Sequence, residues 1–350
     1  MADNGEVVPP LVGVVVLAFG EEPLLAACLA AVLASEQVKV QVVVVDNGFS
    51  SPDEDELRAD ARLTWLTPGT NLGFTGGCNL GAAQLDTSVV AFVNSDAVVA
   101  PGALAALVTA LSDDRVGLVS GQIVLMDDPD IINSVGNPVH YSLISWAGGW
   151  GDPVASHRVE VDVASATGAM FAVRNRDWRN LGGFHEALFA YGEDVELSLR
   201  TWQAGRAVRY VPGAVAAHHY EFSRNPAKFY LLERNRLINL VTLYEARTLR
   251  LLLPALLVIE AGVTAAAVAG GWFPQKLQGW RWLWANRTAV ARRRALVQAS
   301  RLVPDSDIVG LLADAVTPAE GAGVSVPPLA NRALARYGRW VRTRLRREIG

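Results

Sequence analysis

The sequence contains little cysteine and little charge. Its 350 residues include two cysteines, Cys28 and Cys78, and charged residues make up 19% of the chain. Two distant cysteines without neighbouring ligand residues exclude a disulfide-stabilised scaffold and a cysteine-rich metal site, so we expect buried thiols in a reducing compartment. Residues 1–10 also lack a basic segment and a small-residue cleavage site, and no secretory signal is expected.

Two common phosphate-binding motifs are absent as well. Residues 68–79 carry glycines at 73, 76 and 77, but neither the Gly-Lys-Ser/Thr of a Walker A loop nor the Gly-x-Gly-x-x-Gly of dinucleotide sites. Glycines still allow the backbone to approach a ligand closely, just before a helix that we expect to begin near Gly77. The stretch is therefore a glycine loop outside both motif classes.

Hydrophobic residues are abundant, and the charges are unevenly distributed. Hydrophobic residues make up 51% of the sequence, which excludes a disordered chain, and the mean hydropathy of +0.23 leans toward membrane association. Residues 1–245 carry 15 Lys and Arg against 29 Asp and Glu, whereas residues 246–350 carry 16 against 6. This asymmetry favours an acidic catalytic domain followed by a basic, membrane-facing region. A basic tail that only solvates the chain or touches nucleic acid is the alternative.

The most informative stretch of the sequence is an apolar run that ends at Asn94-Ser95-Asp96. Residues 89–93 are five β-formers between polar residues, a pattern typical of a strand buried on both faces. Open α/β sheets bind ligands at the carboxyl ends of such strands, and Asp96 could hold a hard cation there together with phosphates. The alternative is an ordinary turn.

The neighbouring segments predict a strand–helix–strand unit. Residues 11–19 and 38–45 resemble buried strands and residues 24–33 the helix between them, so we expect parallel pairing. Asp46 follows the second strand, where its carboxylate could accept the imide N–H of uracil or thymine, or cap a turn. Further strands are expected at 62–66, 116–124, 166–173 and 207–217, and a further helix at 101–111.

Two later positions could carry chemistry. Residues 193–203 predict a helix, and its first-turn acids either complement the helix dipole or include a general base. The helix N-terminus should lower the pKa of Asp194. His218-His219 ends a predicted strand, where an imidazole could bind a Mn²⁺-like ion or pack as an ordinary strand-end residue.

The back half predicts helices at a membrane surface. Residues 230–244 are helical in pattern, with residues 233–236 on the polar side. Residues 249–273 are long and apolar enough to cross a membrane, but Pro254 and Glu260 disfavour a span, so we expect helices in the interface.

Aromatic and basic residues continue this pattern to the C-terminus. Tryptophans at 272, 280, 282 and 284 beside Lys and Arg are typical of a headgroup boundary, although a helical core or a dimer interface is the alternative. Residues 304–329 are rich in Pro, Gly and Ala and predict a linker. Residues 330–347 carry seven arginines at near-helical spacing, the pattern of a basic amphipathic helix for an anionic leaflet.

Six short motifs, taken in order, resemble family 2 glycosyltransferases. They are Val-Val-Asp-Asn-Gly at 44–48, Asn-Leu-Gly-Phe-x-Gly-Gly-x-Asn at 71–79, Asn-Ser-Asp at 94–96, Leu-Gly-Gly-Phe-His-Glu at 181–186, Tyr-Gly-Glu-Asp-Val-Glu-Leu-Ser-Leu-Arg at 191–200, and Val-Pro-Gly-Ala at 211–214 leading to His218-His219. The resemblance is closest to rhamnosyltransferase-like members of cell-envelope polysaccharide biosynthesis. It implies a GT-A fold, an α/β architecture in which a Rossmann-like mixed sheet is flanked by helices.

The resemblance also implies a reaction. Such enzymes use a divalent cation, Mn²⁺ or Mg²⁺, with a nucleoside-diphosphate sugar, and they usually invert the anomeric centre. We expect a UDP- or dTDP-sugar donor, with rhamnose as the expected sugar, and a lipid-linked or cell-envelope glycan acceptor. Asn94 departs from the family's Asp-x-Asp form and leaves one strong carboxylate ligand at this motif.

Carried over residue by residue, the motifs imply a role for each candidate. Asp194 would be the catalytic base, and Glu193 would orient it or hold an acceptor hydroxyl. The nucleotide sugar would contact Asp46, Asn47, Asn71, Gly73, Gly76, Gly77, Asn94, Ser95 and Asp96. The metal would be held by Asp96 and His218, with His219 as the fallback. Weaker candidates for the acceptor or the diphosphate are Trp146, Trp150, Arg200, Arg224 and Lys228. For Arg200, anchoring the acidic cluster is the alternative.

These expectations define a domain plan and two rival functions. We expect a catalytic domain at 1–240 (halves 11–125 and 126–240), a membrane-associating helical region at 241–303, the linker at 304–329 and a basic helix at 330–350. The protein would be peripheral or monotopic on the cytoplasmic membrane face, bind no nucleic acid, and could form homo-oligomers through its back region. One rival is a sugar-phosphate nucleotidyltransferase, whose glycine-rich basic signature is missing from residues 11–23. The other is a catalytically weak scaffold, favoured only by Asn94.

Overall fold

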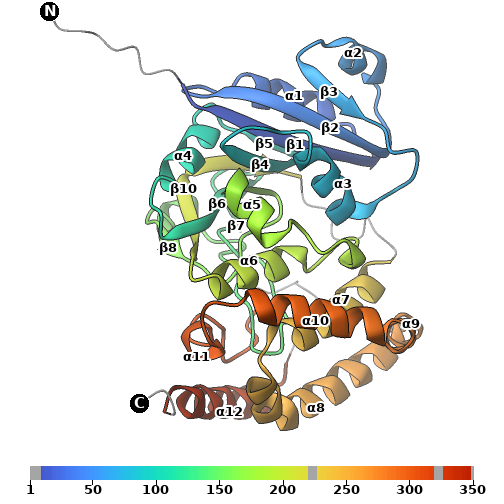
Figure 1. The fold of residues 1–350 in the computed structure, drawn as a ribbon, viewed down its shortest axis with the longest axis vertical. Coiled ribbons are helices and arrows are strands. Elements are labelled where there is room, and N and C mark those ends of the chain that lie inside the picture. The colour runs from blue at the N-terminus through green and yellow to red at the C-terminus, as the bar shows by residue number, and fades with distance from the viewer. Residues whose placement is uncertain (1–8, 220–226, 319–325, 348–350) are drawn as a thin grey trace, which may run out of the picture.

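A mixed β-sheet forms the upper part of the molecule in Figure 1, and a set of helices lies beneath it. The computed structural model describes residues 9–219, 227–318 and 326–347. Within these residues the sheet has ten strands in the order β3-β2-β1-β4-β9-β6-β10-β5, with β7 paired to β6 and β8 paired to β10. The α/β class that the sequence predicts is therefore observed.

The seven predicted strands occur in the predicted order, and the short strands β5, β7 and β8 were not predicted. The strands are β1 (Leu11–Glu21), β2 (Lys39–Ser50), β3 (Leu63–Leu66), β4 (Val89–Asn94), β5 (Ala97–Val99), β6 (Val116–Leu125), β7 (Ile132–Ser134), β8 (Val161–Asp162), β9 (Met170–Arg174) and β10 (Ala207–His218). The helices are α1 (Leu25–Leu33), α2 (Glu54–Ala59), α3 (Gly73–Ala82), α4 (Ala103–Ala110), α5 (Asn175–Leu181), α6 (Glu193–Gln203), α7 (Lys228–Leu243), α8 (Ala246–Ala269), α9 (Phe273–Ala285), α10 (Arg287–Ser300), α11 (Asp305–Ile308) and α12 (Pro328–Arg346).

Parallel pairing brings several strand ends to the same edge of the sheet. β1 pairs in parallel with both β2 and β4, and β10 runs in the same direction on the other side of β9 and β6. At the shared edge, Ala18 pairs with Asp46, and Leu17 pairs with Asn94. β10 ends at His218. Asn94 and His218, the last residues of their strands, and Asp46, four residues before the end of β2, therefore lie toward one edge.

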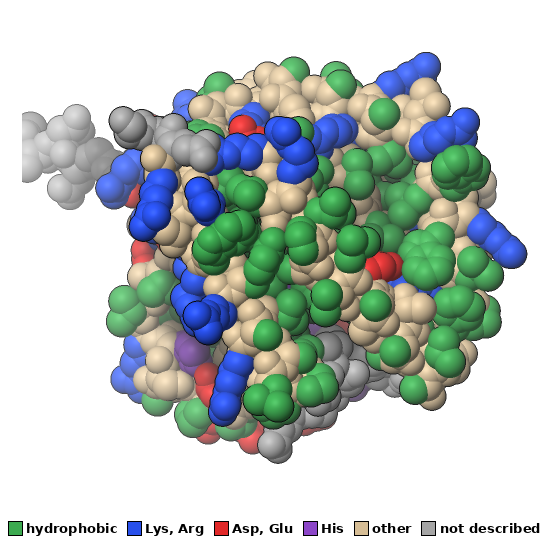
Figure 2. Space-filling view, turned by 90° about the horizontal axis from the view of Figure 1, so that it is seen from below, with side chains coloured by type: hydrophobic (Ala, Val, Ile, Leu, Met, Phe, Trp, Pro, Cys, Tyr) green, Lys and Arg blue, Asp and Glu red, His purple; other side chains and the backbone are tan. Residues whose placement is uncertain are grey.

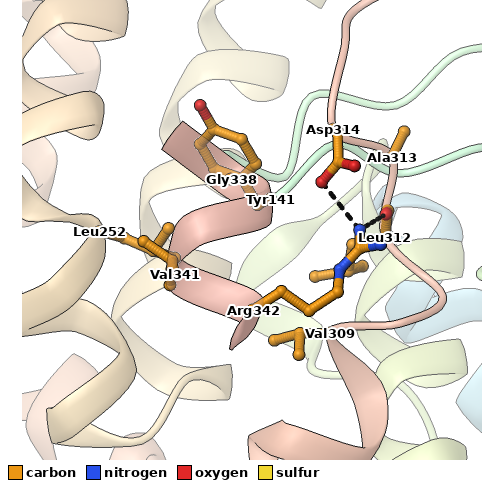
Figure 3. Close-up of a pocket in the computed structure, with 9 residues that line it drawn as sticks. All are labelled: Tyr141, Leu252, Val309, Leu312, Ala313, Asp314, Gly338, Val341 and Arg342. Atoms are coloured by element: carbon orange, nitrogen blue, oxygen red, sulfur yellow. Dashed lines mark hydrogen bonds and ion pairs between the residues drawn. The ribbon is translucent and has the colours of Figure 1, made fainter. Parts of the chain in front are cut away.

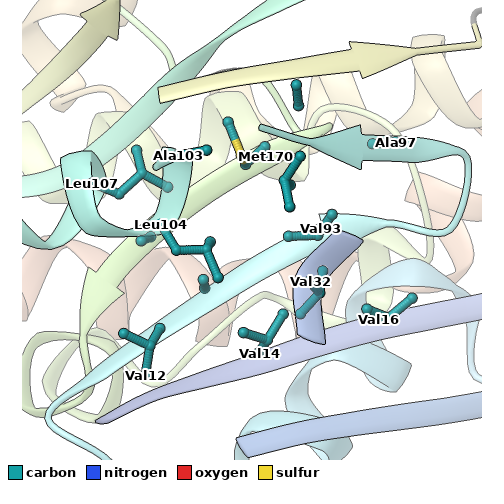
Figure 4. Close-up of a cluster of buried hydrophobic side chains, with 14 of the residues drawn as sticks. Val12, Val14, Val16, Val32, Val93, Ala97, Ala103, Leu104, Leu107 and Met170 are labelled. Atoms are coloured by element: carbon teal, nitrogen blue, oxygen red, sulfur yellow. The ribbon is translucent and has the colours of Figure 1, made fainter. Parts of the chain in front are cut away.

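Both faces of the sheet are covered, which explains why its strands are runs of valine. On one face β1 packs against α1 and α4, with Val12, Val14 and Leu104 fully buried (Figure 4). On the other face α3 lies so close that a Cβ at Gly77 would be 2.0 Å from the Leu17 Cδ1. This helix begins at Gly73, earlier than predicted, and Gly77 is one of its packing residues.

The segment 166–169 is not part of a strand, contrary to the prediction, because β9 begins at Met170. The backbone N–H groups of Ala166 and Thr167 donate to the hydroxyl groups of Ser198 and Ser120, at 3.0 and 3.1 Å. Side-chain acceptors thus satisfy this backbone in place of a strand ladder. The segment remains a loop beside the sheet.

The lower layer consists of α7 to α12 and joins the sheet through a shared apolar cluster. Val195 of α6, Leu252 of α8 and Val341 of α12 are all buried in it. A small pocket lies between α8, α12 and the segment after α11, and there Arg342 binds the Asp314 carboxylate at 2.8 Å (Figure 3). The basic C-terminal helix is therefore docked on the protein along one side.

Part of the predicted linker is folded. Within residues 304–329, α11 is followed by buried Val309, Leu312 and Val316. The Val316 N–H donates to Asn331 Oδ1, and Asn331 Nδ2 donates to the Val316 carbonyl, both at 2.9 Å. Pro, Gly and Ala dominate the composition, but the spaced apolar side chains provide a surface that packs on the helical layer.

Four charged side chains form a cluster between α7, α8 and α9, in which Arg236 and Lys276 are buried and Glu233 and Glu260 are partly buried. Lys276 binds Glu233 at 2.6 Å and Glu260 at 2.8 Å, and Arg236 binds the same carboxylates at 2.9 and 2.5 Å. Burial alone would raise the pKa of each carboxyl, but the two cations hold both pKa values below their usual range. The polar side of α7 therefore faces the protein interior, because its charges are paired there.

We expect Lys276→Met to lower the free energy of unfolding by about 3 kcal/mol, because two partly buried carboxylates lose the buried Lys276 ammonium as a partner. Urea denaturation measures this loss. The loss should shrink as pH falls, because the lowered carboxyl pKa values mean that the stabilising charge is present above the usual pKa of Glu and disappears as both groups protonate. Gln278→Met, at an exposed position of the same helix, is the matched control. A Lys276→Met protein as stable as the wild type would contradict the role of the cluster.

Candidate functional site

Asp46 lies at the shared strand edge with both carboxylate oxygens engaged. Arg58 of α2 donates to Oδ2 at 2.5 Å, and the backbone N–H groups of Gly48 and Phe49 donate to Oδ1 at 3.0 and 3.4 Å. Burial alone would raise the pKa of Asp46, but these hydrogen bonds bring it below the usual value. The Arg58 guanidinium also lies over the Phe49 and Trp65 rings. No motif marks Arg58, and the sequence analysis missed it.

The glycine loop is tied to β2 by side-chain amides. The Asn47 amide donates to Asn71 Oδ1 at 2.8 Å and to the Gly73 carbonyl at 3.1 Å, while Asn47 Oδ1 accepts the Leu72 N–H at 2.8 Å. Asn47 is buried, and its side-chain amide makes these hydrogen bonds to the loop. Asn47 and Asn71 therefore shape the loop that the sequence assigned to the nucleotide.

The three glycines of this loop differ in what they touch. Gly73 has a φ of 70°, and a Cβ there would lie 2.5 Å from the Phe189 carbonyl oxygen. Gly77 packs on Leu17, whereas a Cβ at Gly76 would meet only the Cβ of Leu72, the N-cap residue of the same helix. Gly73 and Gly77 are thus required by close contacts within the protein, and Gly76 is the glycine that these contacts do not explain.

The residues Asn94, Ser95 and Asp96 form the turn at the end of β4. They connect β4 to β5, and β5 runs antiparallel to β10 so that Ala97 lies opposite His218. This pairing places Asp96 Oδ1 3.1 Å from His218 Nε2, and we call these two side chains the aspartate–histidine pair. His219 is exposed, and its backbone N–H donates to the Asp96 carbonyl at 3.1 Å.

The aspartate–histidine pair fits a cation that is shared with phosphate oxygens. Mg²⁺ and Mn²⁺ bind carboxylate and phosphate oxygens, and Mn²⁺ also accepts an imidazole nitrogen. Among residues 9–219, 227–318 and 326–347, no three His, Cys, Asp or Glu side chains gather closely enough to hold a metal ion. The pair would therefore hold a cation together with a diphosphate and water, and Asn94 contributes no second carboxylate.

Glu193 and Asp194 begin α6 at the same edge. Asp194 Oδ2 accepts the Asn137 amide at 2.9 Å, and Oδ1 accepts the Val195 N–H at 2.8 Å. Burial raises the pKa of Asp194 above its usual value, and these hydrogen bonds offset only part of the rise. The lowering expected from the helix N-terminus is therefore wrong, because desolvation outweighs the dipole.

Glu193 is buried and faces the loop 166–169. Its Oε1 lies 3.8 Å from the position that a Cβ on Gly168 would occupy, and its Oε2 is buried without a hydrogen-bond partner. Burial raises the pKa of Glu193, and the neighbouring Asp194 charge raises it further. A carboxyl with a raised pKa retains its proton and can donate a hydrogen bond to a group bound beside it.

Asn137 is a site residue that the sequence analysis missed. Its amide donates to Asp194 and to the Ala166 carbonyl, at 2.9 and 3.3 Å, and its Oδ1 accepts the Ser134 hydroxyl at 3.1 Å. Asn137 thereby joins the candidate base to the loop 166–169. The only signal in the sequence is a Gly-Asn-Pro stretch, which predicts a turn rather than a contact with a distant helix.

Contacts connect these parts into one continuous site. At one end, the glycine loop packs against Phe189, which precedes the two acids of α6. At the other end, the Ala169 carbonyl accepts the Asn94 N–H at 3.0 Å, next to the aspartate–histidine pair. Glu193 faces the loop 166–169 between them. The acids are therefore joined to the glycine loop on one side and to the pair on the other.

The weaker candidates have varied surroundings. Arg200 is buried, binds Glu196 at 2.6 Å and donates to the carbonyls of Leu181 and Gly183, which contradicts a diphosphate contact and fits the anchoring alternative. Lys228 begins α7 with its Nζ 5.7 Å from the Tyr191 ring centroid, and burial lowers the pKa of Lys228 to about 8. Trp146 and Trp150 are half-buried in the segment between β7 and β8. Arg224 lies outside the described residues.

Sequence comparison places this chain beside glycosyltransferases. The sequence pattern of the family described as "Glycosyltransferase like family 2" matches residues 9–239. A pre-mycofactocin glycosyltransferase of Mycobacterium tuberculosis is 32% identical over 183 residues, which are 52% of this chain and 38% of that protein. An N-acetylglucosaminyl-diphospho-decaprenol L-rhamnosyltransferase of the same species is 28% identical over 243 residues, covering 61% of this chain and 78% of that protein. The chain thus spans 38% of the length of the first of these relatives.

Solved structures share the fold. GalNAc-T7 with UDP, GalNAc and Mn²⁺ has a TM-score of 0.56 at 17% identity, covering 67% of this chain and 48% of that one. The mannosyltransferase PcManGT from Pyrobaculum calidifontis, in complex with GDP-Man and Mn²⁺, has a TM-score of 0.50 at 17% identity and covers 97% and 87%. At this identity the likeness concerns the fold, and it confirms a GT-A-like mixed sheet followed by a helical region.

We expect Asp96→Ala to weaken Mn²⁺ binding in the presence of UDP by roughly tenfold or more, because the site loses its carboxylate. His218→Ala should weaken it similarly, whereas the neighbouring His219→Ala, the matched control, should leave the affinity unchanged. Titration of free Mn²⁺ by electron paramagnetic resonance measures each affinity. A loss confined to His219→Ala would move the ligand by one residue, and unchanged binding in Asp96→Ala would exclude the pair.

Proposed function

Because the chain belongs to the glycosyltransferase-like family 2, we propose that it transfers a sugar from a nucleoside-diphosphate sugar to a hydroxyl group of an acceptor. The continuity of the site carries this proposal: Phe189 links the glycine loop to the two acids of α6, and the loop 166–169 links Glu193 to Asn94, next to the aspartate–histidine pair. A donor lying along them would have its diphosphate at the pair and its anomeric carbon near the acids. The family match disfavours the nucleotidyltransferase alternative.

In the proposed reaction each group has one role. Asp46 and the glycine loop hold the nucleoside, and a divalent cation at the aspartate–histidine pair would neutralise charge on the diphosphate. Asp194 accepts the proton of the acceptor hydroxyl while the hydroxyl oxygen attacks the anomeric carbon. The bond between that carbon and the diphosphate oxygen breaks, and the nucleoside diphosphate leaves with the bonding electrons. Attack from the opposite face inverts the anomeric centre.

The environment of the two acids suits this division of labour. A carboxylate with a raised pKa accepts a proton more readily than an ordinary Asp, which favours Asp194 as the base. The Asn137 amide holds one Asp194 oxygen in place. Glu193, which would keep its proton, can donate a hydrogen bond to an acceptor or donor oxygen.

We infer a UDP- or dTDP-linked rhamnose donor and a lipid-linked or cell-envelope glycan acceptor. The support is the rhamnosyltransferase relative, which is matched over 78% of its length, against 38% for the pre-mycofactocin relative. Incubation with a panel of UDP- and dTDP-sugars and Mn²⁺ or Mg²⁺, with detection of released nucleoside diphosphate, tests the donor. Nucleotide binding without turnover on any acceptor would favour the scaffold alternative.

We also propose that the lower layer rests on an anionic membrane surface at the cytoplasmic face. Within the described residues, α8 is the helix long and apolar enough to cross a membrane. Its inner side is buried through Leu252, whereas Leu253, Leu257 and Val258 are 52%, 62% and 65% exposed. Figure 2 shows apolar side chains across this underside, with Lys and Arg among and around them. A docked helix with an exposed apolar stripe fits interfacial binding, and Glu260 stays paired inside the protein.

α12 supplies positive charge beside this stripe. Its inner side is buried through Ala335 and Gly338, whereas Arg332, Arg336 and Arg339 are exposed. Exposed arginines next to an exposed apolar stripe complement anionic headgroups and acyl chains respectively. Pairing of two copies through the same apolar face is the competing use of this surface.

Asp194→Asn should lower kcat by about two orders of magnitude or more, because the general base is lost. Donor affinity measured by calorimetry should change little. The wild-type rate should fall on acidification at a pH above the usual Asp range, since the raised pKa means that Asp194 protonates earlier. Asp86→Asn, at an exposed position, is the control. A large loss of donor binding in Asp194→Asn would remove Asp194 from the base role.

Replacing Arg332, Arg336 and Arg339 together by Gln should weaken binding to phosphatidylglycerol-containing vesicles by about two orders of magnitude, from ~1 kcal/mol per basic residue. Co-sedimentation measures the partition, and high salt should remove the difference. Replacing the exposed Arg62, Arg115 and Arg158 by Gln changes the net charge equally and should have little effect. A soluble dimer that binds no vesicles would refute membrane docking and favour pairing of copies.

A further inference from the structure

The segment 186–192 leads into the two acids of α6 and has an unusual backbone. Phe189 and Tyr191 have φ angles of 66° and 69°, and Gly192, the N-cap of α6, has a φ of 76°. Residues other than glycine rarely adopt positive φ, and such conformations persist only where the surroundings over-determine them. Contacts from elsewhere in the protein must therefore hold this segment.

All seven backbone carbonyls of the segment accept hydrogen bonds from side chains or backbone outside it. Asn235 of α7 donates to the carbonyls of Leu188, Ala190 and Tyr191, at 2.9, 2.8 and 2.7 Å. Arg234 donates to those of Ala187 and Leu188, both at 2.8 Å, and Asn239 donates to that of Gly192 at 2.9 Å. The Thr75 hydroxyl of α3 donates to the Glu186 carbonyl at 3.2 Å, and the Thr75 N–H donates to the Phe189 carbonyl at 3.1 Å.

Asn235 is central to this arrangement. It is fully buried, and its single amide group reaches three carbonyls, two of which belong to the residues on either side of the Ala190–Tyr191 peptide bond. An aspartate at this position would turn carboxylate oxygens toward three carbonyl oxygens, and an alanine would leave buried carbonyls without a donor. The next residue, Arg236, anchors α7 in the four-charge cluster with α8 and α9. The contacts of α7 with α8 and α9 thus hold the donor side chains in place independently of the segment 186–192.

We propose that Asn235 is a positioning residue, whose amide fixes the backbone of residues 188–191 so that Glu193 and Asp194 face the bound donor and acceptor. This rests on the proposed glycosyl transfer at the same site. Asn235 touches neither substrate in this account, and it acts only through the segment. Asn235 donates to carbonyls on either side of Phe189, whereas the glycine loop itself holds the Phe189 carbonyl through Thr75. Replacement of Asn235 should therefore affect the chemical step more than donor binding, which depends on the glycine loop and the aspartate–histidine pair.

Asn235→Ala should lower kcat by about 10²-fold, the effect of a displacement of roughly 1 Å in a catalytic group, with little change in donor KM. The acidic limb of its pH profile should also move toward the usual Asp range, because a displaced Asp194 becomes better solvated. A protein that is only less stable would lose activity without this shift. Thr242→Val is the matched control: Thr242 is equally buried on α7, and its hydroxyl bonds only to the Ile238 carbonyl of its own helix.

Amide hydrogen exchange of residues 186–194 measures the segment without turnover and should be faster in Asn235→Ala but not in Thr242→Val. Should Asn235→Ala not fold, Asn239→Ala, which removes only the bond to Gly192, carries the same measurements with a smaller expected loss of kcat. An active wild type whose kcat, pH profile and exchange are unchanged in these variants overturns the positioning role. If the wild type transfers no sugar but exchange is faster in Asn235→Ala, the proposed function is refuted. The result would still show that Asn235 fixes the backbone of the segment.

Discussion

Parallel pairing of β1 with β2 and β4 is the constraint on which the site depends. Both faces of these strands are covered by helices, so their buried side chains are almost entirely apolar, and the polar residues of the site lie toward the carboxyl ends of the strands. Parallel strands end at the same edge, and Asp46 and Asn94 therefore come to lie along it. The strand β10 adds His218 to that edge, and β5 brings Asp96 beside it.

α7 connects the two layers of the molecule. One set of its polar side chains, including Glu233 and Arg236, is neutralised against α8 and α9, the helices next to the exposed apolar surface. Another set, including Asn235, satisfies the carbonyls of the segment that precedes the acids of α6. α7 therefore binds the helices of the lower layer on one side and the segment 186–192 on the other. The charged groups of the first set are paired with one another, and the amide N–H groups of the second set donate to backbone carbonyls.

Burial decides the electrostatics of the acids. A helix N-terminus by itself stabilises a negative charge, but Asp194 and Glu193 also lose solvent, and desolvation raises both pKa values. The opposite balance holds at Asp46, where Arg58 and two backbone N–H groups outweigh desolvation. The pKa of Asp46 is thus lowered, whereas the pKa values of Glu193 and Asp194 are raised. Their different proposed tasks, nucleobase contact and proton transfer, follow from these surroundings.

The sequence by itself determined seven of the strands, the glycine loop and the polar residues near strand ends, because periodicity and turn chemistry act between near neighbours. The six motifs, in their order, also indicated the glycosyltransferase family. Only the tertiary structure decided that Asn137 and Arg58 bind the candidate carboxylates, that Arg200 is an internal anchor, and that residues 305–316 are folded. The reason is that the partner of a polar side chain, and the solvent that it loses, depend on contacts between residues far apart in the chain.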